Sequence, residues 1–260
     1  MKKRLLENWE KVVDKGFGNR RNICSWSLKE YKDHLYLGTL NFFDGCQIYR
    51  TPTGEKNSWK QVNVDGFDEK NKSSGARTIL VYKNLLWVLA SPSKHGAQIW
   101  VTNGEKSVED DRIIWKKANL DGFGENKVKG SRAMSVFNDK IYIGGQTKEG
   151  TPRILRYDGP TDFDKIQPEK WSWVNKEWQD ESYGFTDYSL IGTLLNFKSN
   201  AEEEFFFAGV YPEAFPLVFK LKKHFDLRTF YKLTKLFYTP NCRIWKYDDK
   251  KWRENVNKGF

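Results

Sequence analysis

Two arginines occupy the same place in successive repeats of the sequence and could bind an anion. Arg77 and Arg132 each lie five residues before the aromatic residue that ends a short apolar segment, Tyr82 or Phe137. A guanidinium is planar and carries several N–H donors, so it pairs well with a carboxylate or a phosphate. Pairing with acidic side chains or carbonyls of the protein itself is the structural alternative. If both side chains approach a shared axis, they predict an anion-accepting funnel, with Arg21 as a third ligand.

Two side-chain amides stand where a second group of apolar segments ends. Asn41 follows the segment 35–40, and Gln146 closes the segment 141–146. Loops that leave buried strands carry many binding residues, because the strands hold such loops in place. We therefore predict that Asn41 and Gln146 contribute to a ligand or partner surface on one face of the molecule.

The sequence contains no motif typical of a metal site or of a catalytic nucleophile. The chain has three histidines and three cysteines, none with metal-ligand spacing and none in a CxxC motif. These residues are His34, His95, His224, Cys24, Cys46 and Cys242. An odd number of cysteines also disfavours a disulfide framework. The sequence thus identifies no catalytic residue, no metal ligand and no cofactor site.

A short Asp-Gly-Phe motif occurs at Asp65 and again at Asp121. Calcium takes about six to eight oxygen ligands, whereas each copy offers one Asp with a single Asn or Glu nearby. A tight turn fits the motif better, with glycine at positive φ and phenylalanine filling the space between sheets.

Tryptophans recur at one position of the repeat, which indicates packing between repeated units. A platform for stacking sugars is the alternative reading of the same residues. They are Trp9, Trp59, Trp115, Trp173 and Trp252.

The elements that must position these residues recur about every fifty residues. Segments 31–38, 82–89 and 137–144 align, with their first residues 51 and 55 positions apart. Each unit can be read as four strands, and its first two strands are joined by a two-residue turn of Lys-Asp, Lys-Asn or Asn-Asp. Four short antiparallel strands in such a period are typical of a β-propeller blade. The chain length holds about five such periods.

The later part of the chain follows the pattern less closely. Segments 188–197 and 204–210 fit the first two strands of a fourth unit, and 217–221 fits its third. A fifth unit is left with 235–238, 242–247 and an outer strand from 252, so we expect it to be shortened. The expected fold is an all-β, five-bladed β-propeller of four-stranded antiparallel blades, a single domain over residues 1–260, with six blades as the alternative.

Units built from GFG, LYLGT and QIYR sequences give the chain a resemblance to five-bladed propellers. It resembles the tachylectin type, which binds sugars, and a five-bladed class that includes nucleotidases and glycoside hydrolases. The glycosidase resemblance implies carboxylates at the starts of several inner strands, because hydrolysis needs two of them around one bond. Only Asp187 is acidic at such a start, so this resemblance fails at the other three.

Composition and charge limit the remaining classes. An aromatic content of 16% within 38% hydrophobic residues excludes a disordered chain. No apolar run is long enough to span a membrane, and the start lacks a signal peptide, so we expect a cytoplasmic protein without a membrane partner. The net charge of +10 is spread along the chain, and a nucleic-acid partner is supported by no motif.

These observations favour a non-catalytic binding or interaction module with an anion- or sugar-binding central funnel. Its partner would be a small anionic or sugar ligand, or another protein. The alternative is a hydrolase of the glycoside hydrolase or nucleotidase type, with its site at the mouth of the funnel.

Overall fold

The fold is built from four antiparallel sheets in a computed structural model of the chain. The structure describes residues 10–110, 112–147, 152–179, 189–200, 202–212, 243–247 and 251–256. Sixteen strands and three short 3-10 helices lie in these ranges, which contain no α-helix. Each sheet contains four strands that are consecutive in the chain and pair in chain order. We call these sheets blades 1 to 4.

The blades have the following strands. Blade 1 contains β1 (Cys24–Tyr31), β2 (His34–Leu40), β3 (Ile48–Thr51) and β4 (Lys60–Gln61). Blade 2 contains β5 (Ala76–Tyr82), β6 (Leu85–Ala90), β7 (Gln98–Thr102) and β8 (Lys116–Lys117). Blade 3 contains β9 (Val128–Phe137), β10 (Lys140–Thr147), β11 (Pro152–Tyr157) and β12 (Trp171–Trp173). Blade 4 contains β13 (Ser189–Lys198), β14 (Glu204–Pro212), β15 (Arg243–Tyr247) and β16 (Trp252–Val256). The 3-10 helices are η1 (Asp121–Asn126), η2 (Phe163–Lys165) and η3 (Lys176–Gln179).

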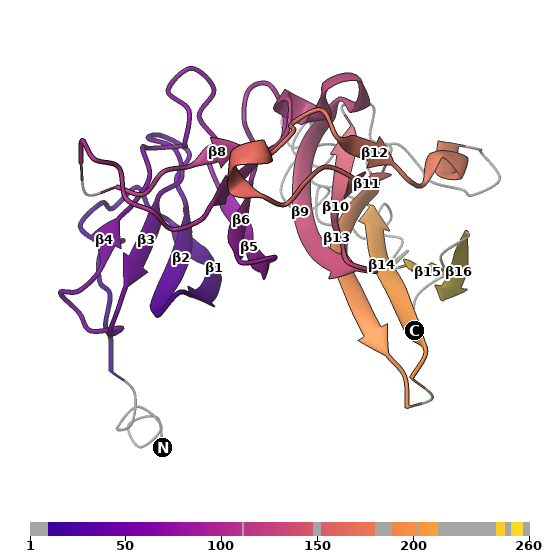
Figure 1. Cartoon of the computed structure of the whole chain (residues 1–260), viewed down its shortest axis with the longest axis horizontal. Helices are drawn as coiled ribbons and strands as arrows, with labels where there is room; N and C mark the ends of the chain where they lie inside the picture. Colours follow the sequence, from indigo (N-terminus) through magenta and orange to yellow (C-terminus); the bar gives the residue numbers. More distant parts are fainter. Residues whose placement is uncertain are drawn as a thin grey trace, which may run out of the picture.

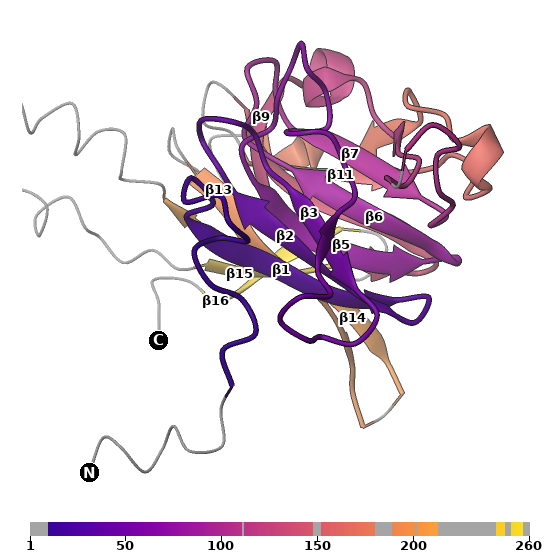
Figure 2. The same ribbon diagram turned by 90° about the vertical axis from the view of Figure 1, so that its left-hand side faces the viewer.

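The blades follow one another in sequence order, from blade 1 at the left of Figure 1 to blade 4 at the right. The first strands of successive blades, β1, β5, β9 and β13, contact one another, which makes them the inner strands. Figure 2 shows the same sheets from the side of blade 1. The expected all-β propeller of four-stranded antiparallel blades is confirmed, and five blades with a shortened last blade fit a structure in which four lie within the described residues.

The last two described strands belong to blade 4 and not, as the sequence predicted, to a fifth blade. Strands β15 and β16 pair with β14 and complete blade 4, whereas segments 242–247 and 252–260 were expected to belong to a fifth unit. The third strand expected at 217–221, the segment 235–238 and Trp9 lie outside the described residues. The spacing between strands misled the prediction, because blade 4 has a long insertion between its second and third strands.

Two-residue turns join the first two strands of the first three blades. Both residues of each turn have positive φ, with values from 44° to 58°. Asparagine and aspartate tolerate this conformation best after glycine, which explains their place in the Lys-Asp, Lys-Asn and Asn-Asp turns. The predicted hairpins are therefore confirmed.

An aromatic ring fills the boundary between blades 1 and 2. Phe67 follows Gly66 in a turn where both residues have positive φ, as the tight-turn reading of the Asp-Gly-Phe motif predicts. The Phe67 ring stacks on Trp100, with centroids 5.2 Å apart, and meets Trp115 edge-on at 5.1 Å. Trp115 also donates from Nε1 to the carbonyl oxygen of Val62 in blade 1, at 3.0 Å. This aromatic group thus ties blade 2 to blade 1.

Trp171 makes the equivalent contacts between blades 2 and 3. It meets Phe123 edge-on at 5.0 Å and donates from Nε1 to the carbonyl oxygen of Ala118 at 2.7 Å. The sequence prediction placed Trp173 in this role and is wrong by two residues. Two tryptophans stand in one short strand, and only the pairing register decides which of them faces the neighbouring blade.

A buried asparagine fixes the outer strand of each of the first three blades. Its Oδ1 accepts a hydrogen bond from the N–H of a third-strand isoleucine at 2.6 Å, and its Nδ2 donates to the carbonyl two residues before that isoleucine. These residues are Asn63, Asn119 and Asn175. A side-chain amide can satisfy a backbone donor and acceptor at once, so a strand pair of only two or three residues is sufficient here.

Apolar side chains fill each boundary between consecutive blades as a separate hydrophobic cluster. Trp87, Ile99 and Ile143 are fully buried between blades 2 and 3. Within the described ranges, none of the helices has the length or apolar composition that crossing a bilayer requires.

Replacing Trp171 should destabilise the protein far more than replacing Trp173. We expect Trp171→Ala to lower the free energy of unfolding by about 3–5 kcal/mol, the usual cost of removing a large buried aromatic side chain. Trp173→Ala should cost about 1 kcal/mol, because Trp173 is half-buried. Urea unfolding of both variants measures the difference, and equal losses would contradict the assignment of Trp171.

Candidate functional site

Every inner strand carries a β-bulge at the same position of the repeat. The register with the second strand shifts around Trp26 in β1, Arg77 in β5, Arg132 in β9 and Gly192 in β13. The sequence repeat aligns these same four residues, so the equivalence of Arg77 and Arg132 is confirmed. A bulge re-aims a side chain out of the regular alternation of its strand. The position is therefore suited to a role other than packing within a blade.

Arg77 stacks on an aromatic residue of the preceding blade. Its guanidinium carbon lies 4.0 Å from the centroid of the Trp26 ring, and its Nε donates to the carbonyl oxygen of Ser91 at 3.0 Å. Trp26 packs against Gly75, where any Cβ would lie 2.2 Å from the ring. Burial raises the pKa of the nearby Cys24 thiol, and the charge of Arg77 opposes this rise. A cation and an aromatic face thus lie together between the inner strands of blades 1 and 2.

Two further predicted residues belong to blade 3. Arg132 is exposed, and its carbonyl oxygen accepts a hydrogen bond from Thr78 Oγ1 at 2.8 Å. Gln146 lies opposite Gly130 near the start of β9. Its Nε2 is buried and has no hydrogen-bond partner within the described part of the chain.

The other two predicted residues, Arg21 and Asn41, both donate hydrogen bonds to the carboxylate of Asp44, which was not predicted as a site residue. Arg21 Nη1 donates to Asp44 Oδ1 at 2.7 Å, and Asn41 Nδ2 donates to Asp44 Oδ2 at 3.2 Å. Asn19 Nδ2 donates to the same Oδ2 at 2.9 Å. The Asn41 side chain also accepts from the backbone N–H of Phe43 and of Asp44. The loop after β2 therefore holds Asp44 in a fixed position.

This carboxylate lies at the end of the propeller where inner strands begin and second strands end, which we call the mouth. Hydrogen bonds from Asn19, Arg21 and Asn41 lower the pKa of Asp44 to about 2, so it is ionised at neutral pH. Phe42 and Phe43 beside it are 60% and 73% exposed. The site thus combines an ionised carboxylate with two exposed aromatic rings.

A departure from the repeat could have revealed Asp44. Gly45 aligns with Gly96, so the residue equivalent to Asp44 in blade 2 is His95. A residue that every blade keeps serves the shared architecture, whereas a residue peculiar to one blade is available for chemistry. Acidic site residues were expected only at the starts of inner strands, and this loop lies at the end of a second strand.

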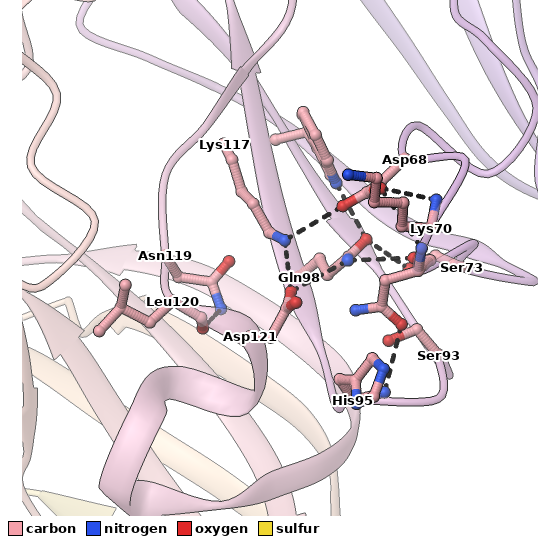
Figure 3. A network of polar contacts seen from close by, with 12 residues as sticks. Asp68, Lys70, Ser73, Ser93, His95, Gln98, Lys117, Asn119, Leu120 and Asp121 are labelled. Atoms are coloured by element: carbon pink, nitrogen blue, oxygen red, sulfur yellow. Dashed lines mark hydrogen bonds and ion pairs between the residues drawn. The ribbon is translucent and has the colours of Figure 1, made fainter.

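The carboxylates of the turns after the outer strands belong to the architecture where Figure 3 shows them, at Asp68 and Asp121. Gln98 Nε2 donates to Asp121 Oδ1 at 3.0 Å, and Ser73 Oγ donates to Gln98 Oε1 at 2.9 Å. Lys117 Nζ lies 2.5 Å from Asp121 Oδ1 and 3.5 Å from Asp68 Oδ2. Burial raises the pKa of Asp121, but the hydrogen bonds from Lys117 and Gln98 outweigh burial and lower it overall.

Blade 1 repeats this arrangement with uncharged side chains in place of the lysine. Gln47 Nε2 and Gln61 Nε2 both donate to Asp65 Oδ1, at 2.8 and 2.9 Å. Because the two Asp-Gly-Phe turns use their aspartates to accept hydrogen bonds from the third and fourth strands, these aspartates hold a turn in place.

Comparison with known proteins leaves the family open. No family model matches the chain, and no curated protein matches it. The expected resemblance to tachylectin-type propellers therefore stays a prediction.

Solved structures with a similar fold include a triple arginine mutant of AofleA from Arthrobotrys oligospora. The identity is 9% and the TM-score 0.50 over 89% of this chain and 56% of that one, so the likeness concerns the fold, and this chain spans just over half of its length. Endo-arabinanases from Bacillus licheniformis and Bacteroides thetaiotaomicron are 10% identical, with TM-scores of 0.45 and 0.46. The similarity extends over 90% of this chain and over 77% and 81% of the two enzymes, respectively.

The expected function is corrected by this comparison. We expected a non-catalytic binding or interaction module, whereas the similar structures named above and several others are mainly glycoside hydrolases of the GH43 type. The prediction of a non-catalytic module with a binding funnel is therefore wrong, and the hydrolase alternative is better supported. TM-scores below 0.5 do not transfer the substrates of those enzymes to this chain.

The lowered pKa of Asp44 should make its contribution to stability depend on pH. Its folded pKa of about 2 lies below the ordinary value of about 3.9. Asp44 therefore stabilises the fold above about pH 4, and this stabilisation is lost as the pH falls toward 2. Thermal melting of the wild type and of Asp44→Asn from pH 2 to 7 should show a difference in Tm near neutrality that disappears at the acidic end. A difference that is constant across this range would contradict the hydrogen-bonded carboxylate.

Proposed function

We propose that the chain is a hydrolase that cleaves a glycosidic bond at the mouth of the propeller, with Asp44 as its ionised carboxylate. The observation that carries this proposal is the set of hydrogen bonds from Arg21, Asn19 and Asn41 to Asp44. Three donors from two separate segments hold one carboxylate oriented and charged. The equivalent position of blade 2 holds His95, so the architecture of the blades does not require an acidic residue at Asp44.

Glycoside hydrolysis needs a carboxylate that stays ionised. The bond between the anomeric carbon and the leaving oxygen breaks, and its electron pair goes to that oxygen, which takes a proton from an acid. The ionised carboxylate either attacks the anomeric carbon or takes a proton from the attacking water, and water supplies the new oxygen. The low pKa of Asp44 keeps this carboxylate ionised at neutral pH, as the second role requires.

Aromatic rings beside Asp44 support a sugar as the substrate. A pyranose or furanose ring has an apolar C–H face that packs against an aromatic side chain. Phe43 is exposed beside the carboxylate and is steadied by the Arg21 guanidinium, 5.6 Å from its centroid. We assign Phe42 and Phe43 to holding the sugar on which Asp44 acts.

We assign the proton donor to Asp187 from its place in the sequence. It is the acidic residue two positions before β13, the inner strand of blade 4, and it lies outside the described residues. Among the starts of the inner strands, the sequence places an acidic residue only here.

Hydrolysis of aryl glycosides tests the role of Asp44. Purified protein should release the aryl alcohol from at least one member of a panel of aryl pyranosides and furanosides. We expect Asp44→Asn to lower kcat/KM by about a thousandfold or more, because an amide cannot serve as nucleophile or base. Asp33→Asn is the matched control, since it removes one carboxylate in the exposed β1–β2 turn. Equal activity of Asp44→Asn and the control would reject the assignment.

The leaving group tests the role of Asp187. A substrate whose leaving group needs no proton, such as a dinitrophenyl glycoside, should restore most of the rate of Asp187→Asn but little of the rate of Asp44→Asn. If Asp187→Asn loses activity on both kinds of substrate, or on neither, Asp187 is not the proton donor.

A further inference from the structure

A cavity of about 300 Å³ lies on the boundary between blades 1 and 2. Its apolar walls include three aromatic rings, and they consist of Val64, Phe67, Trp100, Ile113, Ile114 and Trp115. Phe67 and Trp100 are buried, whereas Ile114 is exposed, so the cavity has an aromatic floor and opens at the surface. This volume is at the lower end of the range for sites that bind small molecules, so the occupant is one compact group.

The rim of the cavity comes from the loop between β7 and β8, which is held in one conformation. The N–H of Ser107 donates to the carbonyl oxygen of Arg112 at 2.8 Å, so the loop folds back on itself. The N–H of Ile113 donates to the carbonyl oxygen of Val62 in blade 1 at 3.2 Å. The rim is therefore fixed to both blades before any ligand binds.

An arginine and an aspartate on this rim form a neutral pair with hydrogen-bonding groups to spare. Arg112 Nε donates to Asp110 Oδ2 at 2.6 Å, and the backbone N–H of Arg112 donates to Asp110 Oδ1 at 2.9 Å. Both side chains line the cavity and both are exposed. Within the described ranges, Nη1 of Arg112 makes no hydrogen bond. A donor thus stands beside the lone pairs of a carboxylate.

The loop that carries Asp44 packs against the turn that lines the cavity. The N–H of Gly66 donates to the carbonyl oxygen of Cys46 at 2.9 Å, and a Cβ added to Gly45 would lie 2.7 Å from Gly66 Cα. Gly45 follows Asp44 in the chain, and Gly66 precedes Phe67. One turn of the chain therefore connects the surroundings of Asp44 to the aromatic floor.

We infer that this cavity is a sugar-binding site, which holds a unit of the glycan away from the bond on which Asp44 acts. The apolar C–H face of a sugar ring suits the aromatic floor, and its hydroxyls both donate and accept, as the Asp110–Arg112 pair requires. The pair has no net charge, so the unit that it binds is a neutral sugar. That the same glycan reaches Asp44 rests on the proposed function.

Binding measurements in the absence of cleavage test the cavity. The full chain carrying Asp44→Asn is titrated by calorimetry with soluble arabinan, xylan and dextran. We expect at least one of these polysaccharides to bind. Adding Asp110→Ala/Arg112→Ala should raise its Kd at least about tenfold, because hydrogen bonds to charged groups are lost. The emission of Trp100 and Trp115, which line the cavity, should change on binding only while the pair is present.

A matched control comes from a second exposed ion pair. Lys165 Nζ lies 3.1 Å from Asp162 Oδ2, and Asp162 Oδ1 accepts from the backbone two residues later, as Asp110 does. Adding Asp162→Ala/Lys165→Ala instead should leave the Kd unchanged, and thermal melting verifies that both combinations remain folded. Equal losses of affinity in the two combinations, or no binding of any of the three polysaccharides, would overturn the inference.

Hydrolysis separates the inference from the proposed function. With Asp44 intact, Asp110→Ala/Arg112→Ala should raise the KM for the bound polysaccharide more than it lowers kcat, because the cavity contacts the glycan equally before and during cleavage. A lower kcat at unchanged KM would contradict the inference. If the wild type cleaves no glycoside, the hydrolase proposal fails, while a Kd that rises only when Asp110 and Arg112 are replaced still supports the sugar site.

Discussion

One repeated contact holds blade 2 against blade 1 and blade 3 against blade 2. A tryptophan at, or directly before, the start of an outer strand donates its indole N–H to a carbonyl of the preceding blade and meets the aromatic ring of the preceding turn. Trp115 does this with Val62 and Phe67, and Trp171 with Ala118 and Phe123. The ring comes from a turn with positive φ, so the contact connects this turn to the next blade. The short outer strands can persist since the buried asparagines and these tryptophans support them.

The same contact sets the positions of the loops at the mouth. Once blade 2 is fixed against blade 1, the start of β5 lies beside the loop that follows β2. The backbone N–H of Asn41 then donates to the carbonyl of Ser74 at 2.7 Å, and that of Cys46 donates to Ser73 at 2.7 Å. Asp44 lies between these two anchoring points. Its position is therefore determined by the boundary between two blades as well as by its own loop.

Much of the architecture could be predicted from the sequence, because repetition is visible in residue types. The hairpin turns, the equivalence of Arg77 and Arg132, and the role of the Asp-Gly-Phe turn followed from recurrence alone. Register was harder: Trp171 and Trp173 stand two residues apart, and tertiary contacts choose between them. The assignment of β15 and β16 to blade 4 also depends on pairing across a long insertion, which spacing cannot reveal.

The candidate site was predictable only in part. Arg21 was predicted as an anion ligand and Asn41 as part of a binding face, but their shared partner was missed. Asp44 accepts hydrogen bonds from Asn19, Arg21 and Asn41, which belong to two segments about twenty residues apart. Because these contacts join separate segments, a local sequence pattern does not predict them. The repeat helps to find such a residue. A position whose residue type differs between blades, as Asp44 differs from His95, is not fixed by packing that the blades share.

The boundary between blades 3 and 4 replaces the phenylalanine with a third indole. Trp178 lies 4.8 Å from Trp245 and 5.4 Å from Trp252, measured between ring centroids, whereas the two boundaries before it place a phenylalanine against the outer-strand tryptophan. Indoles this close share their electronic excitations, so they rotate polarised light and pass on absorbed energy as a group. This boundary is consequently marked by an optical signature of its own, and circular dichroism could follow its opening separately from the melting of blades 1 to 3.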